Sequence, residues 1–82
     1  MELTHPLARW RKLHGWSQKQ LAEACGLSQG MVAHIEGFRR IPLRDSLERL
    51  LDVTGLPTDA LVRPERFLEA HPDFLTPRPP KS

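Results

Sequence analysis

The fold of this chain is decided by the stretch QKQLAEACGLSQGMVAHIEG, which covers residues 18–37. Its pattern is typical of two helices of about eight residues, joined by the short segment 25–27. Gly26 stands where such a tight turn needs a positive φ, which glycine adopts without steric cost. Ala22 is small at the point where the second helix must approach the first. The stretch therefore predicts a pair of helices that cross steeply.

Capping side chains mark where both helices of this pair begin. Ser17 followed three residues later by Gln20 is a capping box, in which each side chain satisfies the other residue's backbone N–H. Ser28 is the N-cap expected before the second helix. The apolar positions that pack the pair together are Leu21, Cys25, Leu27, Val32 and Ile35. These features predict a helix-turn-helix, in which Cys25 is a small buried residue and not a nucleophile.

Three more helices are expected around this pair, so the predicted fold class is all-α. One opens at His5 or Pro6 and runs to His14, a second runs from about residue 44 to Gly55, and a short one follows Pro57. Residues 38–43 are expected to form a loop, and no strand-like alternation is longer than a few residues. The apolar face expected on the first helix comprises Leu3, Leu7, Trp10 and Leu13.

The last part of the chain differs in composition. Residues 64–82 hold five of the eight prolines. We therefore expect a domain over residues 1–62 and a C-terminal extension over residues 63–82, with one or two helical turns at 65–70 and an extended end. The extension also carries apolar side chains that need a surface to cover, on this domain or on a partner protein: Phe67, Leu68, Phe74 and Leu75.

Length and composition exclude several classes of protein. The chain has 82 residues, with 12 Lys and Arg against 10 Asp and Glu, a formal net charge of +2. That length fits about one small domain. The single cysteine cannot form an internal disulfide. No apolar run approaches the ~18 residues that span a bilayer, and residues 1–6 do not look like a signal peptide. We therefore expect a soluble cytoplasmic protein that makes no use of a membrane.

Signals for catalysis and for cofactors are missing. The four histidines lie too far apart along the chain for a metal-ligand spacing. There is no Gly-rich phosphate loop and no Ser/His/Asp arrangement. The sequence therefore predicts no enzyme, no metal and no cofactor.

The charge is distributed unevenly along the chain. Residues 1–44 carry seven basic side chains against three acidic ones, whereas residues 45–82 carry five basic side chains against seven acidic ones. A basic half suggests a polyanionic partner.

Two runs of the sequence resemble a known family. The runs are LARWRKLHGWSQKQLAEACGLSQGMVAHIEGFRRIP at residues 7–42 and LERLLDVTGLPTDALV at residues 47–62. They are similar to the Cro/CI-type (XRE) helix-turn-helix domains of phage repressors and bacterial regulators. The shared features are Ser-Gln at the opening of the first helix of the pair, Leu-Ala inside it, the turn glycine, Ile-Glu at the end of the second helix, and a basic loop with proline. The resemblance implies a five-helix, lambda-repressor-like DNA-binding domain.

The resemblance also implies which residues read bases. The second helix of the pair, about residues 28–36, would enter the major groove of double-stranded DNA, where each base pair shows its own donor and acceptor pattern. The residues placed at base edges are Ser28, Gln29, Gly30, Met31 and His34. Gln29 is the best candidate, because its amide can bond adenine N6 and N7 together. Met31 has a core role as an alternative, and Gly30 stands where the family usually has a polar residue.

Phosphate contacts and one internal ion pair follow from the same resemblance. The phosphate candidates are Gln18, Lys19, Arg39, Arg40 and Arg44. Gln18 would also buttress Gln29, and Arg11 would pair with Glu36 inside the domain. The sequence departs from the family at Phe38, where glycine is common, and at Leu43, where a serine cap is usual. These departures leave the geometry of the loop open.

The function implied is that of a sequence-specific, repressor-like transcriptional regulator, bacterial or phage-encoded and bound to the nucleoid. A homodimer is expected on two half-sites about 34 Å apart, with its surface on residues 57–62 and the segment 67–75. Two alternatives remain open at this point. One is an antitoxin that autoregulates its operator and binds a toxin through residues 63–82. The other is a helix-turn-helix module turned to protein–protein contact.

Overall fold

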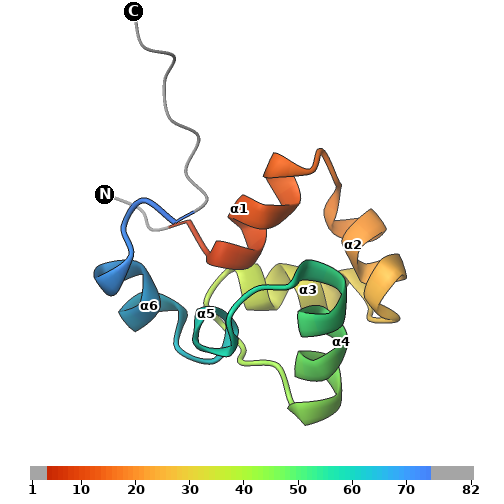
Figure 1. Cartoon of the computed structure of the whole chain (residues 1–82). Helices are drawn as coiled ribbons and strands as arrows, with labels where there is room; N and C mark the ends of the chain where they lie inside the picture. The colour runs from red at the N-terminus through yellow and green to blue at the C-terminus, as the bar shows by residue number, and fades with distance from the viewer. Residues whose placement is uncertain (1–3, 75–82) are drawn as a thin grey trace, which may run out of the picture.

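The computed structural model describes residues 4–74, and within them the chain is helical with no strand (Figure 1). The helices are α1 (Pro6–Leu13), α2 (Gln18–Cys25), α3 (Gln29–Glu36), α4 (Arg44–Thr54), α5 (Thr58–Val62) and α6 (Pro64–Ala70). The predicted all-α fold class is confirmed. The first five helices follow the expected layout, and α6 is the short helix expected at the start of the C-terminal extension.

The helix starts in the central pair are set by the predicted caps. Ser17 Oγ accepts from the backbone N–H of Gln20 at 3.1 Å, and Gln20 Oε1 accepts from the backbone N–H of Ser17 at 2.8 Å. Ser28 Oγ accepts from the backbone N–H of Met31 at 3.1 Å. Gly26 ends α2 with φ +69°. The capping box, the second N-cap and the turn glycine are therefore confirmed.

The start of α1 depends on a buried histidine. His5 is the N-cap, and its Nδ1 accepts from the backbone N–H of Leu7 at 3.0 Å. The side chain is only 1% exposed, and this burial lowers the pKa of His5 from 6.5 to about 4. His5 is therefore neutral in the folded protein at pH 7. Nothing in the sequence pattern distinguished it from the exposed histidines.

One core lies where the helices meet. Its most deeply buried side chains include Leu7, Leu21, Val32, Ile35, Leu50 and Leu61. The expected apolar face of α1 is wrong at Leu13, which is 54% exposed. With 3.6 residues per turn, Leu13 lies about 120° around the helix from Leu7, beyond the edge of the core-facing stripe. Leu3, also expected on that face, lies outside the described residues.

The C-terminal extension packs back on the domain. Phe67 is 9% exposed and Leu68 is 2% exposed, so α6 covers the surface of this same chain. Phe74 is partly buried edge-on against Phe67, with ring centroids 4.8 Å apart. Arg9 Nη1 donates to the backbone oxygen of Phe74 at 3.0 Å, which holds this segment against α1.

Most of the described apolar side chains on the expected dimer surface, residues 57–62 and 67–75, are covered inside the chain, whereas Val62 is half-buried, so the dimer surface stays a prediction. Ala60 and Leu61 of α5 are buried as well, at 0% and 1% exposure. Leu75 and the extended end expected after it lie outside the described residues. Among residues 4–74, none of the helices is long and apolar enough to cross a membrane.

Helix α4 starts without a side-chain cap, and this leads to a stability prediction. Its N-cap residue, Leu43, has the extended backbone (φ −72°, ψ 168°) that a serine cap also adopts, but it makes no capping hydrogen bond. Its side chain is 69% exposed, so little packing is lost when it is replaced. We expect Leu43→Ser to raise the free energy of unfolding by about 1 kcal/mol, measured by urea denaturation followed by circular dichroism.

The matched control for this prediction is Leu43→Ala, which removes the same apolar side chain but supplies no hydroxyl. The serine variant should be the more stable of the two by about 1 kcal/mol. Equal stability of the two variants would show that the backbone N–H groups at the start of α4 gain nothing from a cap.

Candidate nucleic-acid interface

The turn between α2 and α3 is held from the side by α4. Arg49 Nη1 donates to the backbone oxygen of Gly26 at 3.2 Å. The positive φ of residue 26 already favours glycine, and a Cβ at this position would also lie 2.9 Å from that nitrogen. The backbone N–H of Leu27 donates to Ala22 at 2.8 Å and completes the turn. Sequence reasoning missed Arg49, since no local pattern links a side chain of α4 to this turn.

The N-terminal end of α3 is presented to solvent. Ser28, Gln29 and Gly30 are exposed, and His34 is exposed one turn further along the helix. Val32 and Ile35 are fully buried and anchor the opposite side of α3 in the core. A polar face about two turns long therefore projects from a helix that is fixed from behind.

Met31 and Gly30 have opposite surroundings, since Met31 is packed and Gly30 is open. Met31 is partly buried and packs against the core, in agreement with the core role that the sequence left as an alternative. A Cβ at Gly30 would meet nothing within 4 Å. Nothing inside the domain therefore requires glycine at position 30.

A cluster of polar side chains links α1, α2 and the end of α3. Arg11 Nε donates to Glu36 Oε2 at 2.8 Å, and Arg11 Nη2 donates to Glu36 Oε1 at 2.9 Å. The remaining guanidinium nitrogen, Nη1, donates to the backbone oxygen of Trp16 at 2.8 Å. The side chains of Arg11 and Glu36 are 13% and 7% exposed. The hydrogen bond with Glu36 raises the pKa of Arg11, so the guanidinium stays charged.

Gln18 belongs to the same cluster. Its Nε2 donates to Glu36 Oε1 at 3.2 Å. The family resemblance implied that this amide faces a phosphate and buttresses Gln29. In the structure the amide is bound to Glu36 at the C-terminal end of α3. It does not buttress Gln29 there, because Gln29 stands at the other end of that helix.

The cationic phosphate candidates are all exposed. Arg39 and Arg40 lie in the loop between α3 and α4, Lys19 is in the first turn of α2, and Arg44 opens α4. Arg44 Nε lies 3.4 Å from Glu48 Oε1, with both side chains largely exposed. Such an exposed pair contributes little to stability, so Arg44 remains available to a polyanion.

The loop that carries the arginines leaves α3 through a left-handed residue. Phe38 has φ +61°, whereas Gly37 before it has φ −86°. The ring of Phe38 lies against the buried ring of His5, with centroids 5.0 Å apart. Phe38 therefore adopts a conformation that glycine would adopt with less steric strain. The contact of its ring with His5 stabilises this conformation.

Comparison with known proteins agrees with this geometry. A helix-turn-helix family model matches residues 7–61, the span from α1 to α5. The chain belongs to the XRE family of helix-turn-helix domains. A Bacillus subtilis (strain 168) relative, an uncharacterized HTH-type transcriptional regulator called YazB, is 33% identical over 57 residues, which cover 70% of this chain and 83% of the relative. No solved structure matches the chain.

The match locates the elements of this XRE-family domain. The matched span contains α2 and α3, the two helices joined by the short turn at Gly26. Helix α6, which buries Phe67 and Leu68, lies beyond the matched residues. Within residues 4–74, no three His, Cys, Asp or Glu side chains are grouped so as to hold a metal ion.

Proposed function

We propose that this protein is a sequence-specific, repressor-like transcriptional regulator that reads double-stranded DNA with α3. One observation carries the proposal: Gln29 stands exposed at the first position of α3, while Val32 and Ile35 of the same helix are fully buried. A polar helix face fixed by a core can enter the major groove, whose base edges distinguish all four base pairs. Repression follows from occupying DNA that the transcription machinery needs.

Gln29 is the main base-reading residue in this proposal. Its amide carries a donor and an acceptor, which match adenine N7 and N6. Ser28 and Gly30 flank it, and the open space around Gly30 lets the backbone approach the DNA closely. His34 contacts a base or phosphate one turn further along. Met31 contributes mainly by packing, since part of its side chain is taken up by the core.

The phosphate backbone is contacted on both sides of α3. The proposed contacts are made by Gln18, Lys19, Arg39, Arg40 and Arg44. Gln18 contributes through its backbone N–H at the start of α2, because its amide is bound to Glu36. These contacts position the domain and make its affinity depend on salt.

Two copies acting together would lengthen the site. A single recognition helix contacts few base pairs, so we propose that copies bind two half-sites about 34 Å apart on a two-fold symmetric operator. The setting is the cytoplasm of a bacterium or of a phage-infected cell, with the protein bound to the nucleoid.

Selection from a randomised DNA pool tests the proposal. We expect an enriched, two-fold symmetric site, and we expect Gln29→Ala to weaken binding to that site by about 10- to 100-fold, the value of one good bidentate base contact. Arg40→Ala should weaken binding to all sequences alike and lower the slope of log K against log salt by about 1. Fluorescence anisotropy of labelled duplexes, measured at several salt concentrations, reports both effects.

The matched control is Thr58→Ala, which removes a neutral, exposed side chain from α5. Its affinity and its salt slope should equal those of the wild type. A pool that yields no enriched site, with only weak and salt-sensitive binding, would overturn the proposal and favour a helix-turn-helix that contacts another protein.

A further inference from the structure

Leu43 contributes little to the folded domain, although its side chain is large and apolar. It stands at the N-cap of α4, where it makes no capping hydrogen bond. At 69% exposure it is the most exposed large apolar side chain of residues 4–74, and it is not among the side chains that pack against the core. A residue that neither caps its helix nor packs in the core is the kind of local exception that is expected at functional sites.

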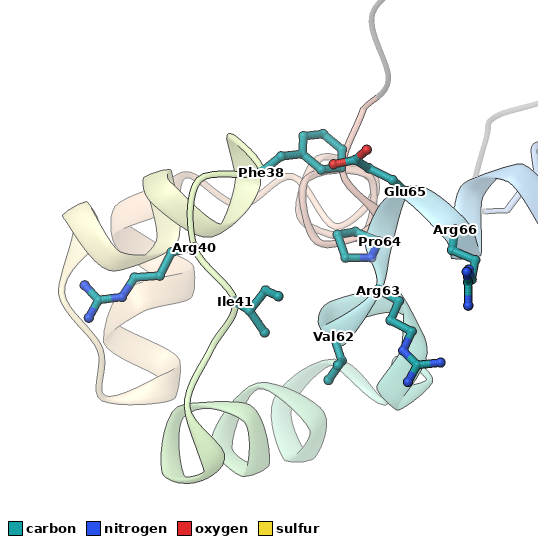
Figure 2. Close-up of a pocket in the computed structure, with 8 residues that line it drawn as sticks. All are labelled: Phe38, Arg40, Ile41, Val62, Arg63, Pro64, Glu65 and Arg66. Carbon is teal, nitrogen blue, oxygen red and sulfur yellow. The ribbon is translucent and has the colours of Figure 1, made fainter.

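The other exposed apolar side chain of the same loop, Ile41, has different surroundings. It lines a hollow of about 280 Å³ between the loop and the junction of α5 with α6. Figure 2 shows Ile41 pointing into this hollow toward Val62, whereas the guanidinium of Arg40 points away from it. Leu43 is not among the residues that line the hollow. Ile41 therefore has apolar neighbours within the chain that Leu43 lacks.

Basic side chains stand on both sides of Leu43 along the chain. Arg39 and Arg40 precede it in the loop, Arg44 follows it directly, and all three are exposed. Within residues 4–74, neither Arg39 nor Arg40 has a side-chain hydrogen bond or an ion pair. Asp45 is the only acidic residue of the segment 38–45. Leu43 is therefore an exposed apolar side chain in a basic segment of the surface.

We propose that the side chain of Leu43 packs against the sugars of the DNA backbone, between phosphates that the neighbouring arginines bind. The inference rests on the proposed function, because it adds a contact to the same DNA-binding surface. A DNA strand alternates charged phosphates with deoxyribose rings, whose carbon atoms are apolar. Contacts to phosphates and sugars position a protein on DNA without reading bases. Leu43 therefore adds affinity for DNA of any sequence by removing apolar area from water.

Other occupants cover only part of this segment. A purely apolar partner would cover Leu43 but would leave Arg39 and Arg40 without counter-ions. A two-fold contact between copies would bring the same surface of each copy together, so the basic segments of both would meet. A DNA strand offers anions and apolar groups in alternation, so it satisfies the arginines and the leucine together.

Fluorescence anisotropy with a labelled duplex that holds one half-site of the selected operator tests the proposal. We expect Leu43→Ala to weaken binding about tenfold, which corresponds to about 1.4 kcal/mol. The slope of log K against log salt should stay unchanged, because the substitution removes no charge and this slope counts neutralised phosphates. Leu43→Met keeps an apolar side chain of similar volume and should bind like the wild type. Arg44→Ala, by contrast, should lower the slope by about 1.

The matched control is Leu13→Ala, which makes the same change at the exposed end of α1 and should leave DNA affinity unchanged. Circular dichroism melts check that all variants fold. Wild-type affinity of Leu43→Ala would overturn the proposal, and so would a loss that comes with a lower salt slope, since the arginines would then explain it. A loss confined to duplexes with two half-sites would instead assign Leu43 to a contact between copies. Failure of the wild type to select any site would overturn the proposed function itself, and this inference with it.

Discussion

Glu36→Gln is expected to lower the free energy of unfolding by about 3–5 kcal/mol, the cost of leaving one member of a buried ion pair without its partner. Glu36 accepts hydrogen bonds from Arg11 at 2.8 and 2.9 Å and from Gln18 at 3.2 Å. The substitution keeps the shape of the side chain but removes its charge and turns one acceptor into a donor. The Arg11 guanidinium then stays charged and nearly buried without a counter-ion. Urea denaturation followed by circular dichroism measures the loss.

The chain offers a matched control for this prediction. Glu48→Gln makes the same change in the exposed pair with Arg44, where the two side chains are 90% (Arg44) and 61% (Glu48) exposed. Water screens that pair, so the expected loss is below about 0.5 kcal/mol. Equal losses in the two variants would contradict the structural role assigned to Glu36. Because Glu36 ends α3, a loosened pair should also disturb this helix, which we propose reads the DNA, and weaken DNA binding.

His5 is expected to make the folded protein less stable as the solution becomes acidic. Burial lowers the pKa of His5 to about 4 in the folded protein, whereas an unfolded chain has the ordinary value of 6.5. The unfolded state therefore binds more protons between these values, and the free energy of unfolding falls as pH falls from 6.5 through 4. A displacement of this size corresponds to about 3 kcal/mol at the acidic end of the range.

The local geometry gives the same sign. Nδ1 of His5 accepts the backbone N–H of Leu7 at 3.0 Å, and a protonated ring has no lone pair left for that bond. Protonation would also place a positive charge at the N-terminal end of α1, where the helix dipole is unfavourable to it. The cap is therefore lost together with the neutral ring.

The comparison variant for this prediction is His5→Asn, which keeps a capping acceptor and does not titrate. Urea denaturation of both proteins at several values between pH 7 and pH 4 gives the two stability curves. We expect the wild type to lose about 3 kcal/mol more than the variant over this range. Parallel curves would mean that other groups cause the acid sensitivity, since carboxylates titrate in both proteins.

The helix-turn-helix itself was predictable because its signals are local. Ser17, Gln20 and Ser28 cap backbone N–H groups within three residues of themselves, so the order of residues alone locates the helix starts. Gly26 was identified for the same reason, from the positive φ that the turn requires. The place of Gln29 near base edges was implied by the family resemblance, and the structure shows this residue exposed at the first position of α3.

Contacts between distant segments were less predictable. The pairing of Arg11 with Glu36 was expected from the family resemblance, not from their spacing of 25 residues. The bond from Arg49 to Gly26 and the capture of the Gln18 amide by Glu36 were not expected, because each depends on how helices are placed relative to one another. Phe38 was noted as a departure from glycine, and the structure shows that it still adopts the left-handed conformation.

The sequence by itself determined the elements of this protein: where the helices begin and, except at Leu13, which face of each is apolar. Those properties depend on neighbours within one or two turns. Only the tertiary structure decided which surface each apolar face covers. Phe67 and Leu68 had to be buried somewhere, since exposed apolar area is unfavourable. They are covered by this same chain, because α6 folds back against the core and Arg9 holds the segment beyond it.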